Sequence, residues 1–229
     1  MFSQANPSDI RKTCFKMKDI ILRWKKAANQ KRFWLFCFLG FLFLASALFF
    51  TGFSGYFADS KKGASLSDLL LDRLPVVNLD FLNTWGFLFI IFVFATAVAV
   101  YQPEEIPFIL ISVALFATIR AGFNILTHLG APADILKMSW EAGILRYFSF
   151  TNDLFFSGHT GLPFLAFLIV KKKMLKRFFL VSSLVMGTSV LLTHTHYSID
   201  VFAAFFITYG IFKISERFFG HLRSLPAEK

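Results

Sequence analysis

Two histidine-containing stretches in the C-terminal half of the sequence have residue types that could carry out nucleophilic chemistry. In "THTHYSID", His196 precedes Asp200 by four residues, so the two side chains would share one face of a helix. The carboxylate can hold one ring nitrogen and leave the other as a base or nucleophile. We therefore interpret His196 and Asp200 as a reactive pair. His194 would point elsewhere and is interpreted as a helix cap or an interfacial residue.

The second stretch, "NDLFFSGHTGLPF", predicts an anion site at the start of a helix. Ser157 is expected to cap that helix, whose free backbone N–H groups and dipole favour a negative charge. Gly158 would let the anion approach the backbone, and His159 would then face a bound phosphate.

Arg120 lies inside an apolar window, and an arginine within a membrane span should face a partner rather than lipid. Asn124 and Thr127 follow it on the same helical face. The planar guanidinium suits a phosphate, which is the functional interpretation. The alternative is a structural ion pair with Asp153 or Glu141.

The composition predicts that membrane-spanning helices position these residues. Hydrophobic residues make up 56% of the 229 residues, whereas soluble domains have about 45–50%. Six apolar windows have the length, about 17–25 residues, that crosses a bilayer. We predict an all-α integral membrane protein whose single catalytic domain, 33–214, is a six-transmembrane-helix bundle. The predicted spans are at about 33–53, 81–101, 106–128, 154–170, 178–194 and 198–214.

Residues 1–32 form a basic leader that is too long for the charged end of a cleaved signal peptide. Apolar residues recur in it at spacings of four and three, which predicts an amphipathic helix on an anionic membrane face. A disordered basic tail is the alternative. Nucleic acid is not expected as a partner, because the charge adjoins a span. The two cysteines, Cys14 and Cys37, indicate neither a disulfide nor a metal site.

Lys and Arg accumulate in the leader, in "KKKMLKR" at 171–177 and in the tail at 215–229. Such residues concentrate on the cytoplasmic side, so both termini are predicted to be cytoplasmic. The loops at about 54–80, 129–153 and 195–197, and the reactive residues, then face the periplasm, the extracellular space or a lumen. In the first of these loops, Ser65 and Asp68 are spaced like a capping box. They predict a short interfacial helix that is either a lid or a simple link.

These motifs resemble those of the type 2 phosphatidic acid phosphatase (PAP2) superfamily, and more closely its sphingomyelin-synthase-like branch. The similarity lies in Asp153 with "SGHT" at 157–160, in "HYSIDV" at 196–201, and in Arg120 with "THLGAP". It covers about residues 65–214. Two features differ: no Lys-x6-Arg-Pro element of the phosphatase branch is evident, and Asn152 stands where the animal sphingomyelin synthases have Gly.

The resemblance implies a lipid phosphatase or phosphotransferase that acts at the outer leaflet on a phospholipid or lipid phosphate. It implies no metal and no other cofactor. His196 would attack phosphorus, Asp200 would orient and charge it, and His159 would protonate the departing alcohol, which leaves a phosphohistidine. The residues assigned to binding of the substrate phosphate are Arg120, Ser157, Gly158 and Asp153.

Two other classes of protein would use the same residues differently. A transporter or pore would line an ion path with Arg120, both motif histidines and Asp200, although no internal repeat is evident. A metal-dependent hydrolase would use the histidines at 159, 194 and 196 with Asp200 as ligands. It would lack an H-E-x-x-H motif, and histidines two residues apart on a helix are poorly placed for one ion.

Overall fold

The computed structural model describes residues 7–61, 63–136 and 150–223, with the backbone alone for 7–16. Within these residues the protein is all-helical and has no strand, as the sequence predicts. The α-helices are α1 (Pro7–Ala28), α2 (Lys31–Ser60), α3 (Phe87–Tyr101), α4 (Ile106–Leu126), α5 (Gly158–Ile169), α6 (Lys173–Leu192) and α7 (Ser198–Phe219). Short 3-10 turns lie at Leu71–Arg73, Pro103–Glu105 and Gly220–Arg223, and a π-helical turn at Leu82–Gly86.

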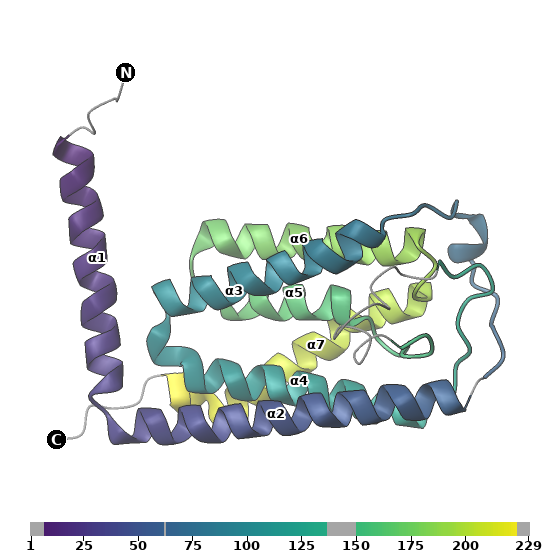
Figure 1. The fold of residues 1–229 in the computed structure, drawn as a ribbon, viewed down its shortest axis with the longest axis horizontal. Helices are drawn as coiled ribbons and strands as arrows, with labels where there is room; N and C mark the ends of the chain where they lie inside the picture. Colours follow the sequence, from purple (N-terminus) through teal and green to yellow (C-terminus); the bar gives the residue numbers. More distant parts are fainter. Residues whose placement is uncertain (1–6, 62, 137–149, 224–229) are drawn as a thin grey trace.

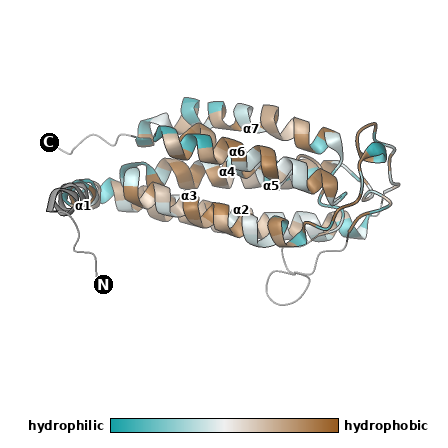
Figure 2. Ribbon diagram, turned by 90° about the horizontal axis from the view of Figure 1, so that it is seen from above, coloured by the Kyte–Doolittle hydropathy of each residue, from teal (hydrophilic) through white to brown (hydrophobic). Residues whose placement is uncertain are grey.

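Helices α2–α7 run alongside one another, whereas α1 runs across one end of the bundle (Figure 1). The middle parts of the helices are apolar, and polar residues concentrate toward the two ends (Figure 2). Five segments of the described chain are long and apolar enough to cross a membrane: Lys31–Ser60, Leu82–Tyr101, Pro103–Leu126, Lys173–Leu192 and Ser198–Arg223. They indicate a multi-pass membrane protein, because about 20 apolar residues span the hydrocarbon core.

The apolar helix α5 is shorter than a full span. The sequence predicts a span at 154–170, but α5 has 12 residues, which is about 18 Å at 1.5 Å per residue. Leu154, Phe155 and Phe156 lengthen the apolar window without joining the helix, because the helix begins after its cap Ser157. Helix α5 packs against α6 and α7 and contributes Leu165 and Ile169 to the buried core.

The two ends of the bundle carry different segments. Helix α1, Pro103–Glu105, the link at 170–172 and Gly220–Arg223 lie at one end, which we call the basic end (Figure 1). The loops at 61–80, 127–136, 150–157 and 193–197 lie at the other, which we call the site end. This grouping agrees with the predicted separation of the loops. The membrane side that each end faces stays a prediction.

Two side chains dock α1 on the basic end. Trp24 Nε1 donates to Ala99 O at 2.8 Å, and Arg23 Nη1 donates to Tyr101 O at 3.1 Å. Ile21 and Leu22 of the same helix are exposed. An exposed apolar face beside basic residues suits a membrane surface, and the interfacial position of this helix stays a prediction.

The loop at 61–80 corrects one interpretation of the sequence. Ser65 does not cap a helix, since its hydroxyl donates to Ala131 O. Asp68 caps the turn instead: its Oδ1 accepts from the N–H groups of Leu70 and Leu71 at 3.0 and 3.1 Å. The expected interfacial helix is a single 3-10 turn, Leu71–Arg73. Asp68 Oδ2 also accepts from Ser198 N at 2.7 Å, which fastens the loop to the start of α7.

Candidate active site

The segment 153–160 connects the elements of the site. Ser157 is the N-cap of α5, as the sequence predicts, and its Oγ accepts from Thr160 N at 3.4 Å. Its own N–H donates to Asp200 O at 3.0 Å, so the starts of α5 and α7 are held together. A Cβ added at Gly158 would lie 3.2 Å from Arg120 Nε. The N-terminus of α5 therefore meets a guanidinium, and both features favour an anion.

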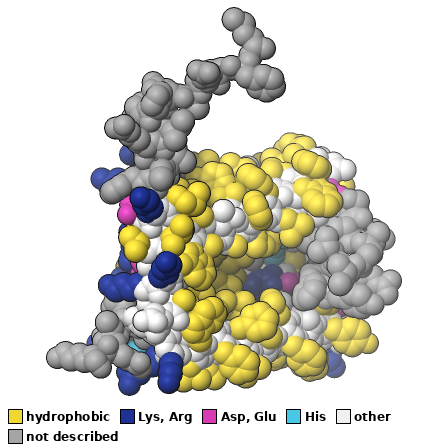
Figure 3. Space-filling view, turned by 60° about the vertical axis from the view of Figure 1, so that its left-hand side comes forward, with side chains coloured by type: hydrophobic (Ala, Val, Ile, Leu, Met, Phe, Trp, Pro, Cys, Tyr) yellow, Lys and Arg dark blue, Asp and Glu magenta, His cyan; other side chains and the backbone are white. Residues whose placement is uncertain are grey.

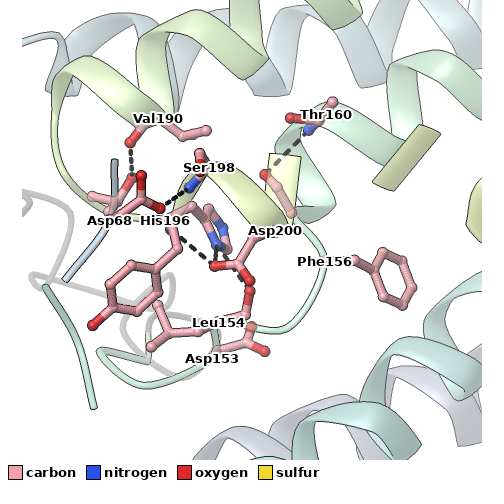
Figure 4. Close-up of polar contacts among 12 residues, drawn as sticks. Asp68, Asp153, Leu154, Phe156, Thr160, Val190, His196, Ser198 and Asp200 are labelled. Atoms are coloured by element: carbon pink, nitrogen blue, oxygen red, sulfur yellow. Dashed lines mark hydrogen bonds and ion pairs between the residues drawn. The ribbon is translucent and has the colours of Figure 1, made fainter. Parts of the chain in front are cut away.

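His196 and Asp200 are in contact, although they do not share a helix face as the sequence suggests. Helix α7 begins at Ser198, so His196 lies in the turn before it and Asp200 in its first turn. His196 Nδ1 lies 3.1 Å from Leu154 O and 3.3 Å from Asp200 Oδ2 (Figure 4). Both partners are acceptors, so in the neutral ring Nδ1 carries the proton and Nε2 keeps the lone pair. This tautomer suits a nucleophile at Nε2.

Asp200 is fully buried and uses one of its two oxygens. Oδ2 accepts from Tyr197 N at 3.0 Å and also faces His196, whereas Oδ1 is buried and has no hydrogen-bond partner among the described residues. A buried carboxylate is costly unless a positive charge lies beside it. Asp200 is therefore placed to stabilise His196 when that ring becomes positively charged.

Arg120 binds the segment before α5 through three contacts. Its Nη1 pairs with Asp153 Oδ2 at 2.7 Å, Nη2 donates to Asp153 O at 3.2 Å, and Nε donates to Phe156 O at 3.2 Å. The structural pair with Asp153 that the sequence left open is thus present, and Glu141 lies outside the described residues. Phe156 has a φ of 38° and a fully buried ring. This uncommon backbone conformation turns its carbonyl toward Arg120.

His159 faces a residue that the sequence did not point to. Its Nε2 lies 3.2 Å from Asn83 O, and its ring lies 4.4 Å from that of Phe87, measured between centroids. Asn83 is fully buried in the π-helical turn, where its amide contacts Ser189 Oγ (2.5 Å) and Thr193 Oγ1 (3.0 Å). π-Helical turns are frequent at functional sites, but no residue pattern here predicts this one.

Asn152 connects the segment before α5 to two other parts of the site end. Its N–H and side-chain amide donate to Asp59 Oδ1 at 2.8 and 3.0 Å, and its Oδ1 accepts from Ala131 N at 3.0 Å. Glycine could not make the two side-chain bonds. Asn152 therefore fixes the start of the 153–160 segment to the end of α2 and to the loop after α4.

The other polar residues that the sequence singled out have distinct surroundings. Asn124 is fully buried, and neither of its amide atoms has a hydrogen-bond partner within the part of the chain that the structure describes, whereas Thr127 bonds back to Phe123 O. His194 ends α6 in a left-handed conformation with a φ of 53°. Its N–H bonds to Leu191 O and Thr195 N to Val190 O, the two bonds of a Schellman cap.

The described residues contain no group of three or more His, Cys, Asp or Glu side chains placed to hold a metal ion.

The flank of the bundle is hollowed beside the site (Figure 3). Apolar side chains surround the hollow, and basic, acidic and histidine side chains show at its bottom. A lipid could therefore place its polar group on charged residues while its chains remain against apolar ones.

Fold and site together define a class: a helical, multi-pass protein with a buried His–Asp pair and an arginine facing a helix N-terminus. Residues 151–217 match the family described as PAP2 superfamily C-terminal. The match includes both histidine motifs and supports the resemblance to the PAP2 superfamily over this part of the chain. No curated protein sequence matches the chain.

Proposed function

We propose that the protein is a lipid phosphatase or phosphotransferase of the PAP2 type, in which α5 completes a bundle of six spans. The observation that carries the proposal is His196, held at Nδ1 by Leu154 O and Asp200 beside the N-terminus of α5. The apolar flank around the hollow favours a lipid substrate over a soluble one (Figure 3). The Lys-rich basic end is taken as cytoplasmic, which puts the site at the outer leaflet.

In the proposed first step, Nε2 of His196 attacks the substrate phosphorus while the bond from phosphorus to the departing alcohol breaks. His159 gives its proton to that alcohol, and His196 becomes phosphohistidine. Asp200, 3.3 Å from Nδ1, stabilises the positive charge that develops on the ring.

In the second step, His159 takes a proton from the acceptor, whose oxygen bonds to phosphorus as the nitrogen–phosphorus bond breaks. Neutral His196 is recovered. Water as the acceptor makes the protein a phosphatase, and an alcohol makes it a phosphotransferase, as in the sphingomyelin-synthase-like branch. Neither step uses a metal ion.

The substrate phosphate is proposed to lie between the N-terminus of α5, with Ser157 and Gly158, and Arg120. Three of the guanidinium's five N–H groups contact the 153–160 segment, which leaves two for the substrate. An ionised carboxylate only accepts hydrogen bonds and cannot donate one to a phosphate. Asp153 is therefore proposed to act by positioning Arg120. This revises the assignment of Asp153 as a direct phosphate ligand.

The test is to reconstitute the full-length protein with a panel of lipid phosphates, phospholipids and sphingolipids, and to identify products by mass spectrometry. We expect at least one lipid to release phosphate or to transfer its headgroup, with activity that persists in a chelator. His196→Ala and His159→Ala should abolish it. His221→Ala, which changes an exposed histidine at the basic end, should not.

Two results would contradict the proposal. The first is no lipid product with any substrate, together with an ion flux across the vesicle membrane that depends on His159. The second is lipid turnover that a chelator abolishes and added zinc restores, which would favour a metal-dependent hydrolase.

A further inference from the structure

A cavity lined by charged and apolar residues lies at the basic end of the bundle, away from the candidate active site. Its volume is about 430 Å³, within the range of small-ligand sites. Helix α1 forms one wall, and the turn Pro103–Glu105, the link at 170–172 and the turn Gly220–Arg223 contribute to the others. Its basic lining residues are Arg23, Lys26, Lys171 and Arg223.

The acidic residues at this end do not balance the basic ones. Arg23 pairs with Glu104 at 3.2 Å. Fully buried Glu105 is shared between Arg223, at 3.0 Å, and Lys171, and Arg223 also meets Glu216 at 2.9 Å. Lys26 is exposed and has no acidic partner in the described part of the chain. Figure 3 shows Lys and Arg side chains gathered at this end of the molecule. The cavity therefore has a net positive lining that suits a phosphate group.

Other lining groups favour a lipid headgroup over a free phosphate ion. Glu104 lines the cavity, and its carboxylate can accept from a headgroup hydroxyl. Ala27 and Phe33, with exposures of 4% and 2%, give an apolar wall beside the charges. The cavity also lies where α2 begins, at the end of a segment able to cross the membrane.

We propose that this cavity binds an anionic phospholipid from the leaflet opposite the active site. The phosphate contacts Lys26 and Arg23, the headgroup hydroxyl donates to Glu104, and the glycerol backbone packs on Phe33. Basic pockets between helices at the cytoplasmic face are suited to such headgroups. The bound lipid holds α1 against the bundle, and this role does not depend on the reaction at the site end.

The proposal is tested by titrating the full-length protein in detergent with phosphatidylglycerol, and separately with phosphatidylcholine, by native mass spectrometry. We expect phosphatidylglycerol to bind more tightly. Lys26→Gln should weaken its binding by about fivefold, the effect of one basic residue near a membrane surface, and leave phosphatidylcholine unchanged. Lys25→Gln is the matched control, because Lys25 is exposed on the same helix outside the cavity lining, and it should change neither.

Three results would overturn the proposal. Equal phosphatidylglycerol binding by the wild type and Lys26→Gln would show that the lipid does not bind in this cavity. An equal loss with Lys25→Gln would mean diffuse attraction to basic residues. Displacement of the lipid by inorganic phosphate at the same concentration would indicate a site for a free ion. The catalytic proposal is tested by turnover, so the two can fail separately.

Discussion

Two arginine–carboxylate pairs lie at opposite ends of the same bundle, and their surroundings differ. At the basic end, Arg223 meets fully buried Glu105 at 3.0 Å, and Glu105 also faces Lys171 and accepts from Gln102. At the site end, Arg120 meets Asp153 at 2.7 Å, and Asp153 has no second basic partner in the described part of the chain.

The backbone conformation also differs between the two ends. The site end has the positive φ of Phe156 and the π-helical turn beside His159. Such backbone strain persists mainly where function needs it. We therefore expect the basic end to determine stability and the site end to determine turnover.

The largest effect should come from Arg120→Lys, which replaces a planar donor by a point charge. We expect kcat/KM to fall by about 100-fold or more, as when a donor that stabilises the transition state is lost, with little change in the melting temperature. Steady-state kinetics and thermal unfolding of the purified protein measure the two. Arg73→Lys, at an exposed loop arginine of the same end, is the control. Near-normal turnover with Arg120→Lys would make the arginine structural.

At the basic end, Glu105→Gln should lower stability and spare the chemistry. The change leaves Lys171 without its acidic partner and Arg223 with Glu216 alone, so we expect a loss of about 2 kcal/mol in the free energy of unfolding. Glu104→Gln breaks a more exposed pair and should cost less than about 1 kcal/mol. Unfolding measured in the same detergent checks both. Lost turnover in folded Glu105→Gln protein would contradict the division between the ends.

A smaller effect is expected from Ser189→Ala, which removes the hydroxyl 2.5 Å from Asn83 Oδ1. The π-helical turn that places Asn83 O against His159 would loosen, so kcat should fall by about tenfold while KM stays the same, the pattern of a misplaced proton donor. Thr188→Ala, at the exposed neighbour, should leave kcat unchanged. A rise in KM alone would show that Ser189 affects binding instead.

The smallest effect concerns the loop at 61–80. Burial acts to raise the pKa of Asp68, but hydrogen bonds from Leu71 N and Ser198 N outweigh it, so this pKa lies below its ordinary value of 3.8. The ionised carboxylate therefore stabilises the fold above that value, and the stabilisation is lost as the pH falls through the lowered pKa. Relative to Asp68→Asn, the wild type should be about 1 kcal/mol more stable at neutral pH.

Thermal unfolding at a series of pH values measures this difference, and it should shrink at acid pH. Asp134→Asn, at an exposed aspartate of the same end, should show no such dependence. A difference that stays constant at every pH would show that the charge of Asp68 does not contribute to stability.

Apolar length and motif spacing were enough to predict an all-helical bundle, and the structure brings His196, Asp200 and Ser157 together. The start of α5 was not predictable, because Leu154 and Phe156 are as apolar as the helix while their backbone follows another path. The contact of Asn83 with His159 was not predictable either, since a backbone carbonyl in a π-helical turn leaves no pattern of side chains. Asp153 was assigned to phosphate because sequence does not show which carboxylate an arginine meets.

The central claim is that His196 is the nucleophile, and trapping a phosphoenzyme tests it most directly. The full-length protein would be exposed briefly to a lipid labelled in its phosphate, quenched, and analysed for protein-bound label. We predict an acid-labile, alkali-stable phosphoryl group that maps to His196, is absent in His196→Ala, and forms more slowly in Asp200→Asn. Active protein that shows no label on any timescale, or carries equal label in His196→Ala, would contradict the account.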